Sequence, residues 1–402
     1  MSFLKTLQLH INDIENDIYQ IRRQLHKYPE LSGEETNTSE LVKEKLTEYG
    51  ISYEHGFAGT GVLGVIKGGK PGKTVALRAD MDALPIQETN DHDFSSEVEG
   101  KMHACGHDAH TAMLLGTGYA LKKIEEQIEG TVLLVFQPAE ESSPIGGSGP
   151  MMEDGVFHEY KPDVIYGQHV WPGLPVGEMG IRDKEMMGAS DRFTVKVTGR
   201  GGHASMPHEG NDAIIITNQM ISSLQTIVSR NVNPLNSAVV TIGRIEGGDR
   251  YNVIPKEVSF EGTVRTYKPE VKEMIKKRFH TILNQTAEAF DAEVDIEYLD
   301  GYPATINTPA YAQQARKTAQ RIFGENATPQ VEPALAGEDF SRFLLDYPGA
   351  FIWLGTQIEQ AAEQKPLHDP GFQLDEKALP MGSHFMAEVA IDTLKSLSSQ
   401  GG

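Results

Sequence analysis

The sequence contains very little cysteine, and it lacks both an excess of basic residues and a long apolar run. Cys105 is the one cysteine among 402 residues, which excludes an intramolecular disulfide and suits a reducing compartment. Asp and Glu (57) outnumber Lys and Arg (36), and the net charge of -21 would repel phosphate backbones and anionic lipids. The first residues, MSFLKTLQLHINDIEND, carry polar or charged side chains every few positions, unlike a signal peptide or a membrane span of about 20 apolar residues. We therefore expect a cytoplasmic protein that binds neither nucleic acid nor a membrane.

The first part of the chain has the pattern of an α/β domain. With 402 residues the chain is long enough for two ordinary domains, and its hydrophobic fraction of 39% is typical of globular proteins. Residues 5–27 repeat apolar positions at steps of three and four, which predicts an amphipathic helix. Short, almost wholly apolar runs follow at 75–77, 132–136 and 164–166, with helical stretches between them. Runs of this kind are typical of strands buried on both faces, so we predict a mixed sheet covered by helices.

The middle of the chain has a different pattern, in which strands with alternating apolar residues are more frequent. Strand-like segments occur at 192–198, 238–245, 258–265 and 294–298, and helical segments occur at 213–228 and from 269 onward. The order β-α-β-β-α-β is that of a small split βαβ, or ferredoxin-like, sandwich. The α/β pattern resumes after Gly301. We therefore predict a discontinuous α/β domain, residues 1–187 and 302–402, with a second domain, residues 188–301, inserted into it.

The densest group of potential metal ligands is the segment HACGHDAH at 103–110. Its three histidines and Cys105 directly precede an apolar helical stretch. Imidazole and thiolate are donors that suit zinc, cobalt, nickel or manganese. Since one residue separates Cys105 from His107, an extended loop would let both side chains face a common point. The alternative is a helix-capping loop in which the thiol is buried and inert.

Two adjacent carboxylates, Glu140 and Glu141, follow the apolar strand at 131–136. The carboxyl end of a buried strand is where open α/β sheets usually bind ligands. Two neighbouring anions repel each other, so both stay ionised only where a cation or a water network compensates. One carboxylate could therefore bind a metal while the other transfers protons, although Glu-Glu pairs are also common on solvated loops.

Further potential ligands follow other apolar strands. His169 lies just past one such strand, and Asp80 and Asp82 lie just past another, where they could orient metal ligands. His368 lies in the segment PLHDP near the C-terminus. Taken singly, each has an ordinary structural explanation, such as a hydrogen-bonded core histidine. Together they predict one site at one edge of the sheet, with His, Cys, Glu and Asp as metal donors.

Other catalytic patterns are absent or incomplete. Residues 59–64 match the Gly-x-Gly-x-x-Gly of dinucleotide-binding proteins, but a strand-like segment follows instead of a helix. The Gly-rich segment 199–203 lacks the elements that flank a phosphate loop, and no Gly-x-Ser-x-Gly nucleophile elbow occurs. A nucleophile made of Cys105 and a histidine is conceivable. The many metal donors around Cys105 favour a ligand role over this alternative.

Several segments resemble the aminoacylase branch of the dinuclear zinc-peptidase superfamily, which includes hippurate hydrolases, indole-acetyl-amino-acid hydrolases and N-acetyl-diaminopimelate deacetylases. The segments are RRQLHKYPEL (22–31), LRADMDALP (77–85), HACGHDAH (103–110), QPAEE (137–141), GGHA (201–204), NVIP (252–255), GEDF (337–340) and LH (367–368). They extend over nearly the whole chain in the family's order. The resemblance implies a metallopeptidase-like catalytic domain (1–187 and 302–402) and an inserted lid and dimerisation domain (188–301).

The resemblance also implies a metal centre with a glutamate base. The implied ligands of two divalent ions, of the zinc, manganese, cobalt or nickel type, are Cys105, His107, Glu141, His169 and His368. Glu140 would be the general base. Asp80 stands where the wider superfamily has the histidine of a His-x-Asp motif, and Asp82 keeps the aspartate. The branch compensates with Cys105. A second departure is Asp369, where histidine or asparagine is frequent, and this change does not exclude activity.

In the inserted domain the resemblance implies roles for three residues. His203 would reach the active site of the partner subunit in a homodimer and stabilise the tetrahedral oxyanion, with Asn252 nearby. Arg265 would bind the substrate carboxylate, although a surface arginine at the end of a strand would have the same sequence context.

The expected activity is hydrolysis of the amide bond of N-acyl amino acids, as in aminoacylases and hippurate hydrolases. Water activated at two cations would attack the carbonyl, and Glu140 would take up the proton of this water. Dipeptidase and N-acetyl-diaminopimelate deacetylase activities are alternatives, and a non-catalytic metal-binding relative is a more remote one. The segment around Cys105 favours an acyl substrate over a dipeptide.

Overall fold

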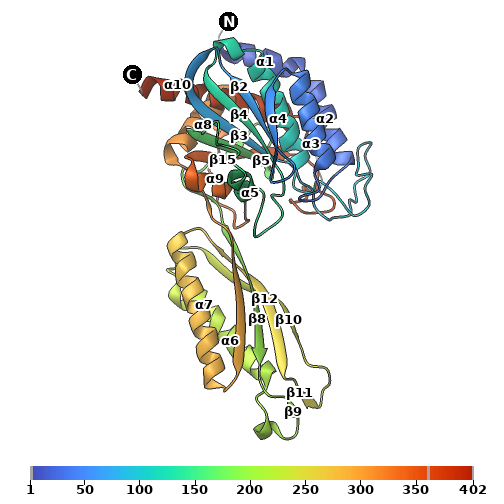
Figure 1. Cartoon of the computed structure of the whole chain (residues 1–402), viewed down its shortest axis with the longest axis vertical. Coiled ribbons are helices and arrows are strands. Elements are labelled where there is room, and N and C mark those ends of the chain that lie inside the picture. The colour runs from blue at the N-terminus through green and yellow to red at the C-terminus, as the bar shows by residue number, and fades with distance from the viewer. Residues whose placement is uncertain (1–2, 360–362, 401–402) are drawn as a thin grey trace. The chain divides into compact units, whose positions relative to one another are not determined.

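The computed structural model describes residues 3–359 and 363–400, and the chain divides into two compact units (Figure 1). The first unit contains Met1–Met186, Ile306–Glu332 and Asp339–Gly402. The second contains Met187–Thr305 and Pro333–Glu338. The second unit is therefore interposed within the first along the chain.

The first unit is built on a seven-stranded mixed sheet with the strand order β1-β2-β4-β3-β5-β15-β6. Its strands are β1 (Ser52–Phe57), β2 (Gly61–Lys67), β3 (Lys70–Asp80), β4 (Glu129–Gln137), β5 (Val164–Pro175), β6 (Met179–Gly180) and β15 (Gly349–Gln357). β3 pairs in parallel with β4 and β5, and β15 pairs in parallel with β5. Residues 132–136 of β4 are all buried, which explains why this stretch has no polar side chain. The α/β class predicted from the sequence is confirmed.

Helices cover this sheet. They are α1 (Phe3–Asp13), α2 (Glu15–Lys27), α3 (Thr36–Glu48), α4 (His107–Lys122), α5 (Ser148–Glu153), α8 (Pro309–Phe323), α9 (Phe340–Asp346) and α10 (Ala378–Gln400). α4 packs against β3, α2 and α10, and α9 packs against β5 and β15 (Figure 1). Because α4 is buried along almost its whole length, most of its faces carry apolar or small side chains, and the helix is not amphipathic. Its first turn is thereby fixed beside the sheet.

Two helices, α1 and α2, replace the single helix predicted at 5–27. Ile14 lies between them in a non-helical conformation (φ -117°, ψ 13°). The apolar spacing continues across the break, since Ile11, Ile14 and Ile18 are all buried. Apolar periodicity alone therefore cannot reveal the interruption.

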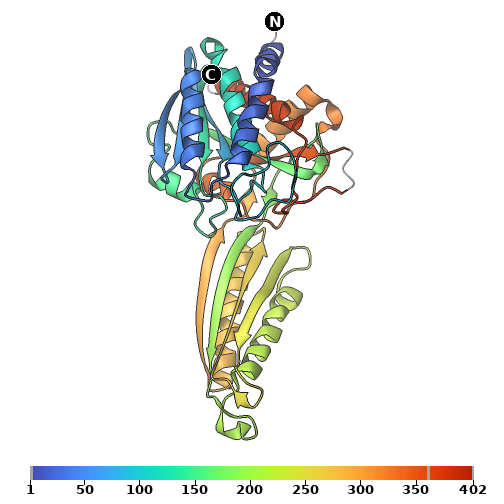
Figure 2. The same cartoon turned by 90° about the vertical axis from the view of Figure 1, so that its right-hand side faces the viewer.

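The second unit is a four-stranded antiparallel sheet with two helices along one face (Figure 2). Its main elements follow in the order β8 (Ala189–Thr198), α6 (Ala213–Thr226), β10 (Ala238–Gly247), β12 (Glu257–Thr266), α7 (Pro269–Ala289) and β13 (Glu293–Tyr302). Across the sheet the strand order is β10-β12-β8-β13. Phe193, Phe260 and Phe279 belong to the core between this sheet and its helices. This chain order is the β-α-β-β-α-β order read from the sequence.

The remaining strands are short. They are β7 (Glu185–Met187), β9 (Gly202–His203), β11 (Val253–Ile254) and β14 (Thr305–Ile306). In the second unit β9 pairs antiparallel with β11, and this pairing sets His203 opposite Val253.

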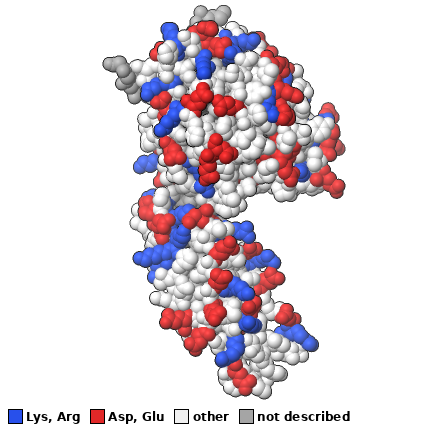
Figure 3. Space-filling model, in the orientation of Figure 1, with Lys and Arg blue, Asp and Glu red and all other residues white. Residues whose placement is uncertain are grey.

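Charged side chains of both signs cover the face of the molecule in Figure 3, where Lys and Arg are interspersed among Asp and Glu. In this view the acidic excess is distributed over the surface rather than gathered in one patch. Within 3–359 and 363–400, none of the helices combines the length and the apolar character that crossing a bilayer requires.

Candidate functional site

Three parallel strands end at one edge of the seven-stranded sheet, and the chain carries predicted site residues at this edge. β3 ends at Asp80, and β4 ends at Gln137, shortly before Glu140. His169 lies in β5, the third of these strands. The carboxyl edge of such a sheet is where ligands usually bind.

Gly106 brings the segment with Cys105 close to this edge. It precedes α4 in a left-handed conformation (φ 83°), which a glycine adopts without strain. A β-carbon at position 106 would lie 2.4 Å from Cγ2 of Val170. The close approach of this loop to β5 therefore requires a glycine.

Cys105, His107 and His169 form one buried cluster, in which the ligand atoms all lie within 4.8 Å of one another. Sγ of Cys105 is 3.4 Å from Nε2 of His169. Nδ1–H of His169 donates to the Val170 carbonyl at 2.8 Å, which leaves the Nε2 lone pair facing the sulfur. Burial lowers the pKa of His169, so the imidazole is neutral, which is the form that binds metals.

Glu141 and His368 extend this cluster. Oε1 of Glu141 is 3.0 Å from Nε2 of His368, and both groups lie within 4.8 Å of Cys105. His368 has a left-handed backbone (φ 66°), which is uncommon for a residue with a side chain. Its backbone N–H donates to the carbonyl of Ala104 at 2.8 Å. Strained backbone of this kind is concentrated at functional sites.

Asp82 holds the neighbouring residues in place. Its carboxylate accepts hydrogen bonds from the backbone N–H groups of Glu140 and Glu141, at 3.1 and 2.9 Å. It also accepts a hydrogen bond from the Ser32 hydroxyl at 2.6 Å. Nδ1 of His107 is 3.2 Å from the same carboxylate. Burial alone would raise the pKa of Asp82, but the hydrogen bond from His107 lowers it, so Asp82 is an anion that fixes both the histidine and the glutamates.

His107 presents its other ring nitrogen to the cluster. This Nε2 makes no hydrogen bond in the described part of the chain, although the residue is 0% exposed; it lies 3.6 Å from Oδ2 of Asp80. Burial alone would lower the pKa of His107, but the negative charge of Asp80 raises it to about 10. The negative charges around this ring therefore favour positive charge at its position.

Sulfur, imidazole and carboxylate groups thus surround one small region that favours positive charge. This donor set, with the orphaned Nε2 of His107, fits a divalent cation of the zinc class. Burial and the nearby Glu141 and Glu140 charges raise the pKa of the Cys105 thiol. The thiolate is both the nucleophilic and the metal-binding form, so the thiol would have to lose its proton in either role.

Glu140 and Glu141 have different neighbours, although they are adjacent in the sequence. Glu141 lies with Cys105 and His368, whereas Oε1 of Glu140 accepts a hydrogen bond from the backbone N–H of Asp339 at 3.3 Å. Ala139 before them has a left-handed backbone (φ 56°). Both carboxylates lie within 4.8 Å of His107, so the turn at the end of β4 separates only their other neighbours.

Asp339 is a residue of the site that the sequence did not identify. Its carboxylate accepts hydrogen bonds from Arg78 at 2.9 Å and from Gln137 at 2.8 Å, as well as from the backbone N–H groups of Gly147 and Ser148 at 2.9 Å. These contacts fix the loop that follows Glu140. Arg78 and Gln137 are 261 and 202 positions away along the chain, so no local pattern connects them with Asp339. The one signal was the segment GEDF at 337–340.

His103 and His110 differ from His107 in their surroundings. Nδ1–H of His110 donates to Asp80 at 2.5 Å, and its Nε2 accepts the backbone N–H of Val170 at 2.9 Å. Both nitrogens are thereby occupied, so His110 positions β5 rather than binding a cation. His103 is 1% exposed, and burial lowers its pKa to about 4.

Comparison with known proteins identifies the family. Residues 76–392 match peptidase family M20/M25/M40. The chain belongs to this family. It is 41% identical over 388 residues to the N-acetyl-L-cysteine deacetylase of Bacillus subtilis (strain 168), with 96% of this chain and 91% of the relative covered. It is 40% identical over 393 residues to thermostable carboxypeptidase 1 of Saccharolobus solfataricus, with 97% of this chain and 99% of the relative covered.

A solved structure supports the same conclusion. The Bacillus subtilis YXEP protein, described as a dinuclear metal binding peptidase from the M20 family, has a TM-score of 0.83 and 34% identity, with 96% of this chain and 99% of that chain covered. The family expected from the sequence segments is thus confirmed. This M20 protein is a hydrolase of amide bonds with divalent metal cofactors.

The remaining predicted residues of this M20 hydrolase lie in the second unit. His203 and Asn252 line the same open cavity, of about 1150 Å³, near β9 and β11. Oδ1 of Asn252 is buried and has no hydrogen-bond partner among the described residues. Arg265 lies beside Gly337, near the end of β12 that is opposite Glu257. At a rise of about 3.3 Å per residue, Arg265 is about 26 Å from Glu257 along the strand. The second unit thus brings His203 and Asn252 together and keeps Arg265 apart from them.

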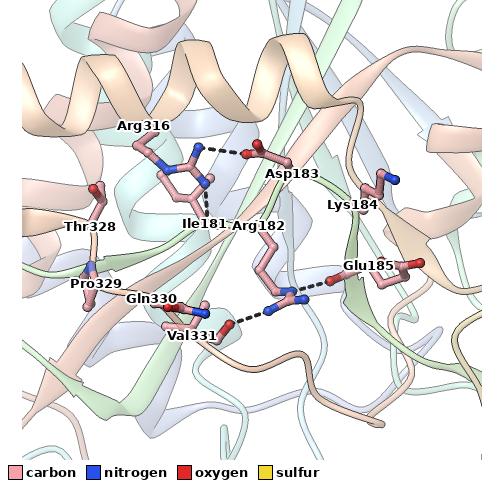
Figure 4. Close-up of a pocket in the computed structure, with 10 residues that line it drawn as sticks. All are labelled: Ile181, Arg182, Asp183, Lys184, Glu185, Arg316, Thr328, Pro329, Gln330 and Val331. Atoms are coloured by element: carbon pink, nitrogen blue, oxygen red, sulfur yellow. Dashed lines mark hydrogen bonds and ion pairs between the residues drawn. The ribbon is translucent and has the colours of Figure 1, made fainter. Parts of the chain in front are cut away.

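A cavity of about 430 Å³ in the first unit is lined by two arginines whose guanidinium groups already have acceptors (Figure 4). Arg316 pairs with Asp183 at 2.7 Å and with the carbonyl of Ile181 at 2.9 Å. Arg182 donates to the carbonyls of Glu185 and Val331, at 2.8 and 2.6 Å. These arginines therefore hold loops together at this cavity, because each guanidinium donates two hydrogen bonds to neighbouring loops.

Proposed function

We propose that this M20 hydrolase removes the acyl group from N-acyl amino acids. The observation that carries the proposal is the group of donors beside Glu140 at one edge of the sheet. This group comprises Cys105, His107, Glu141, His169 and His368. The deacetylase relative, at 41% identity, supports an acylated amino acid as the substrate class.

In this proposal the five donors hold two divalent ions of the zinc, manganese, cobalt or nickel type. When bound, such ions polarise the amide carbonyl and lower the pKa of a coordinated water toward about 7. The neutral imidazole of His169 and the Nε2 of His107 without a hydrogen-bond partner support these ligand roles. Asp82 orients His107 through Nδ1, as carboxylates commonly do for metal-binding histidines.

Glu140 acts first as a general base and then as a general acid. Its carboxylate takes a proton from the attacking water and passes it to the nitrogen of the leaving amine as the C–N bond breaks. Proton transfer of this kind typically accelerates a reaction by about 10²–10⁴-fold. The hydrogen bonds from the backbone N–H of Asp339 to Glu140, and from that of Glu140 to Asp82, keep the carboxylate in position.

His203 of the partner subunit is proposed to stabilise the oxyanion in a homodimer, with Asn252 beside it. Nδ1 of His203 accepts the backbone N–H of Ser205 at 3.1 Å, so Nε2 carries the proton of the neutral imidazole. An exposed Nε2–H is a suitable donor to a developing oxyanion. The buried Oδ1 of Asn252 without a partner supports a polar contact that is completed by substrate or by a second chain.

Arg265 is proposed to bind the substrate carboxylate. Its side chain is half-buried, and no hydrogen bond from its guanidinium is found within the described residues. Burial lowers the pKa of Arg265, and the negative charge of the nearby Asp191 opposes this shift. A planar guanidinium in this state suits a carboxylate that binds through two hydrogen bonds.

A substrate panel tests the proposal against its alternatives, which are dipeptides, N-acetyl-diaminopimelate and peptides with a free carboxyl end. The carboxypeptidase relative, at 40% identity, favours the last of these. We expect kcat/KM for N-acetyl or N-benzoyl amino acids to exceed that for matched dipeptides at least tenfold, with activity lost on chelation and absent from Glu140→Gln. The proposed substrate class is wrong if the dipeptides are preferred. Metal content without hydrolysis of any substrate would indicate a non-catalytic relative.

A further inference from the structure

A second group of metal-type donors lies in the first unit, and none of its members is used by the proposed reaction. Nε2 of His26 is 3.3 Å from Oε1 of Glu88, and Nε2 of His92 is 3.5 Å from the same oxygen. The three ligand atoms all lie within 4.8 Å of one another. The side chains of His26 and Glu88 are only 1% and 2% exposed, whereas His92 is 21% exposed. The group is thus enclosed on the side of His26 and accessible at His92.

In each donor of this group, a second polar atom that faces away from the group also has a polar partner. Nδ1 of His26 is 2.8 Å from Oδ2 of Asp108, and Nδ1 of His92 is 3.2 Å from the Ser95 hydroxyl. Oε2 of Glu88 accepts the backbone N–H of Ser96 at 2.6 Å. Histidines that bind metals almost always have their other ring nitrogen held in this way, by a carboxylate or another polar group. Both histidines therefore direct Nε2 toward Oε1 of Glu88, which also accepts a hydrogen bond from Nδ2 of Asn90 at 3.0 Å.

The charges around the group are of both signs, because Glu88 is an anion and the cationic Arg22 acts on both histidines. Burial alone would raise the pKa of Glu88, but the hydrogen bond with His26 lowers it to about 2, so the carboxylate is anionic. Burial lowers the pKa of His92, so its imidazole is neutral. Burial alone would also lower the pKa of His26, but the charge of Asp108 raises it. A cation at Nε2 would take the place of the proton that His26 otherwise holds, so binding would release that proton.

We propose that His26, Glu88 and His92 bind a zinc-class divalent cation, separate from the ions at the sheet edge. Two imidazoles and one carboxylate are a donor set that zinc uses in sites with an open fourth position. In a tetrahedral site with bonds of about 2.0–2.1 Å, neighbouring ligand atoms are roughly 3.3–3.4 Å apart. The observed separations of 3.3 and 3.5 Å agree with this geometry. The accessible side of His92 provides the entry path and a place for a water ligand.

The cation would fasten the loop that leads into the candidate active site. Glu88 and His92 belong to the segment between β3 and α4, and this segment continues into Cys105 and His107. His26 belongs to α2, so a shared cation would tie this loop to the helix layer. Asp108, which holds His26, is the neighbour of His107 in the sequence and is itself held by Arg22 at 2.8 Å.

Metal content of the full-length protein tests the proposal. Wild-type protein, His92→Gln and Glu88→Gln are stripped with a chelator, reloaded with Zn²⁺ and freed of excess ion, and zinc per chain is measured. His55→Gln is the matched control, because His55 is an exposed histidine on β1. We expect both site variants to hold one zinc ion fewer than wild type and His55→Gln. Ser95→Ala should weaken binding of this ion by about 10–100-fold, since it removes the group behind His92.

Loading with Co²⁺ separates this site from the sheet edge. Cys105 is the one cysteine of the chain, so a thiolate-to-cobalt charge-transfer band reports on the sheet edge alone. We expect His92→Gln to keep this band while losing one cobalt ion per chain. Equal metal content in wild type and His92→Gln would overturn the proposal, and so would an equal loss in His55→Gln. Loss of the thiolate band together with the ion would also overturn it, because His92 would then support the sheet-edge site. Absence of the band in wild type would count against the proposed function. The comparison of metal content between wild type and His92→Gln would still test the second site.

Discussion

The functional residues of the two units differ sharply in burial. In the larger unit Cys105 and His169 are 7% and 4% exposed. In the smaller unit His203 is exposed beside an open cavity, and the apolar side chains of Ile215 and Tyr251 are 56% and 95% exposed. The larger unit therefore buries its candidate ligands Cys105 and His169, whereas the smaller unit leaves His203 and large apolar side chains exposed.

The difference indicates what each unit needs in order to function. The sheet edge of the larger unit encloses anions, a thiol and a ring nitrogen without a hydrogen-bond partner, and this combination is completed by positive charge. Both units expose large apolar side chains, but more of them lie on the smaller unit, and we expect such a surface to pack against another one. A divalent metal centre and a second copy of the chain are therefore the two additions that we expect, and substitutions in both units test them.

The largest effects are expected at the adjacent glutamates. Glu140→Gln keeps the shape of the side chain but cannot accept a proton, so kcat should fall by about 10²-fold or more while metal content is retained. Glu141→Gln weakens a charged ligand, so metal occupancy should fall and excess metal should restore part of the rate. Metal analysis and kinetics on both variants distinguish these outcomes. Loss of metal from Glu140→Gln with full occupancy in Glu141→Gln would mean that the roles are reversed.

His203→Ala tests whether the smaller unit acts on the partner subunit. Removal of one oxyanion donor should lower kcat by about 10²–10³-fold. Mixed with Glu140→Gln protein and allowed to exchange subunits, it should regain activity, because each mixed dimer has one site with both groups. Inactive mixed dimers, or an active monomer, would contradict action between subunits.

Cys105→Ser tests the ligand role of the buried thiol. The variant should bind less metal and lose activity accordingly, because a hydroxyl is a poor replacement for a thiolate ligand. In wild type, bound metal should slow alkylation of Cys105 strongly relative to the metal-free protein. Equal alkylation rates with and without metal, together with full metal content in the serine variant, would show that Cys105 is no ligand.

Ile215→Glu tests the apolar surface of the smaller unit. If this surface lies between two copies of the chain, the buried charge should shift the protein toward a monomer in sedimentation and lower its activity. The matched control is Ile145→Glu in the larger unit, where the side chain is 64% exposed. A dimer that is unchanged by Ile215→Glu, or disrupted equally by the control, would place the interface elsewhere.

Arg265→Gln should have the smallest effect. Loss of a charged contact with the substrate carboxylate should raise KM by about tenfold, since hydrogen bonds to charged groups contribute about 1.5–3 kcal/mol. Substrates whose carboxylate is replaced by an amide should be affected much less. An equal change in KM for both substrate types would show that Arg265 does not bind the substrate carboxylate.

Local sequence patterns were sufficient for the α/β class, the order of elements in the smaller unit and the M20 family. The apolar runs of β3, β4 and β5 predicted strands, and the polar residues after them predicted a shared sheet edge. The break at Ile14 was missed because buried positions keep the same spacing across it. The network around Asp339 was missed because its partners are brought close only by the tertiary fold. The pairing of His26 with Glu88 was missed for the same reason.

The metal-ligand roles, the homodimer, the domain boundaries and the cytoplasmic location stay predictions. The divalent cofactors and the hydrolysis of amide bonds rest on membership of the family. The structure adds a physical reason for the metal, because Cys105, His107 and His169 are buried and, with Glu141 and the half-exposed His368, they surround a region that favours positive charge.

Anomalous X-ray diffraction from crystals of the metal-loaded protein, recorded at the absorption edge of the bound metal, locates the metal ions directly. We expect two anomalous peaks at the carboxyl edge of the seven-stranded sheet, within bonding distance of Cys105, His107, Glu141, His169 and His368, with Glu140 beside them and outside the ligand set. Fully loaded crystals with no peak at this edge, or with Glu140 as a direct ligand in place of Glu141, would contradict this expectation.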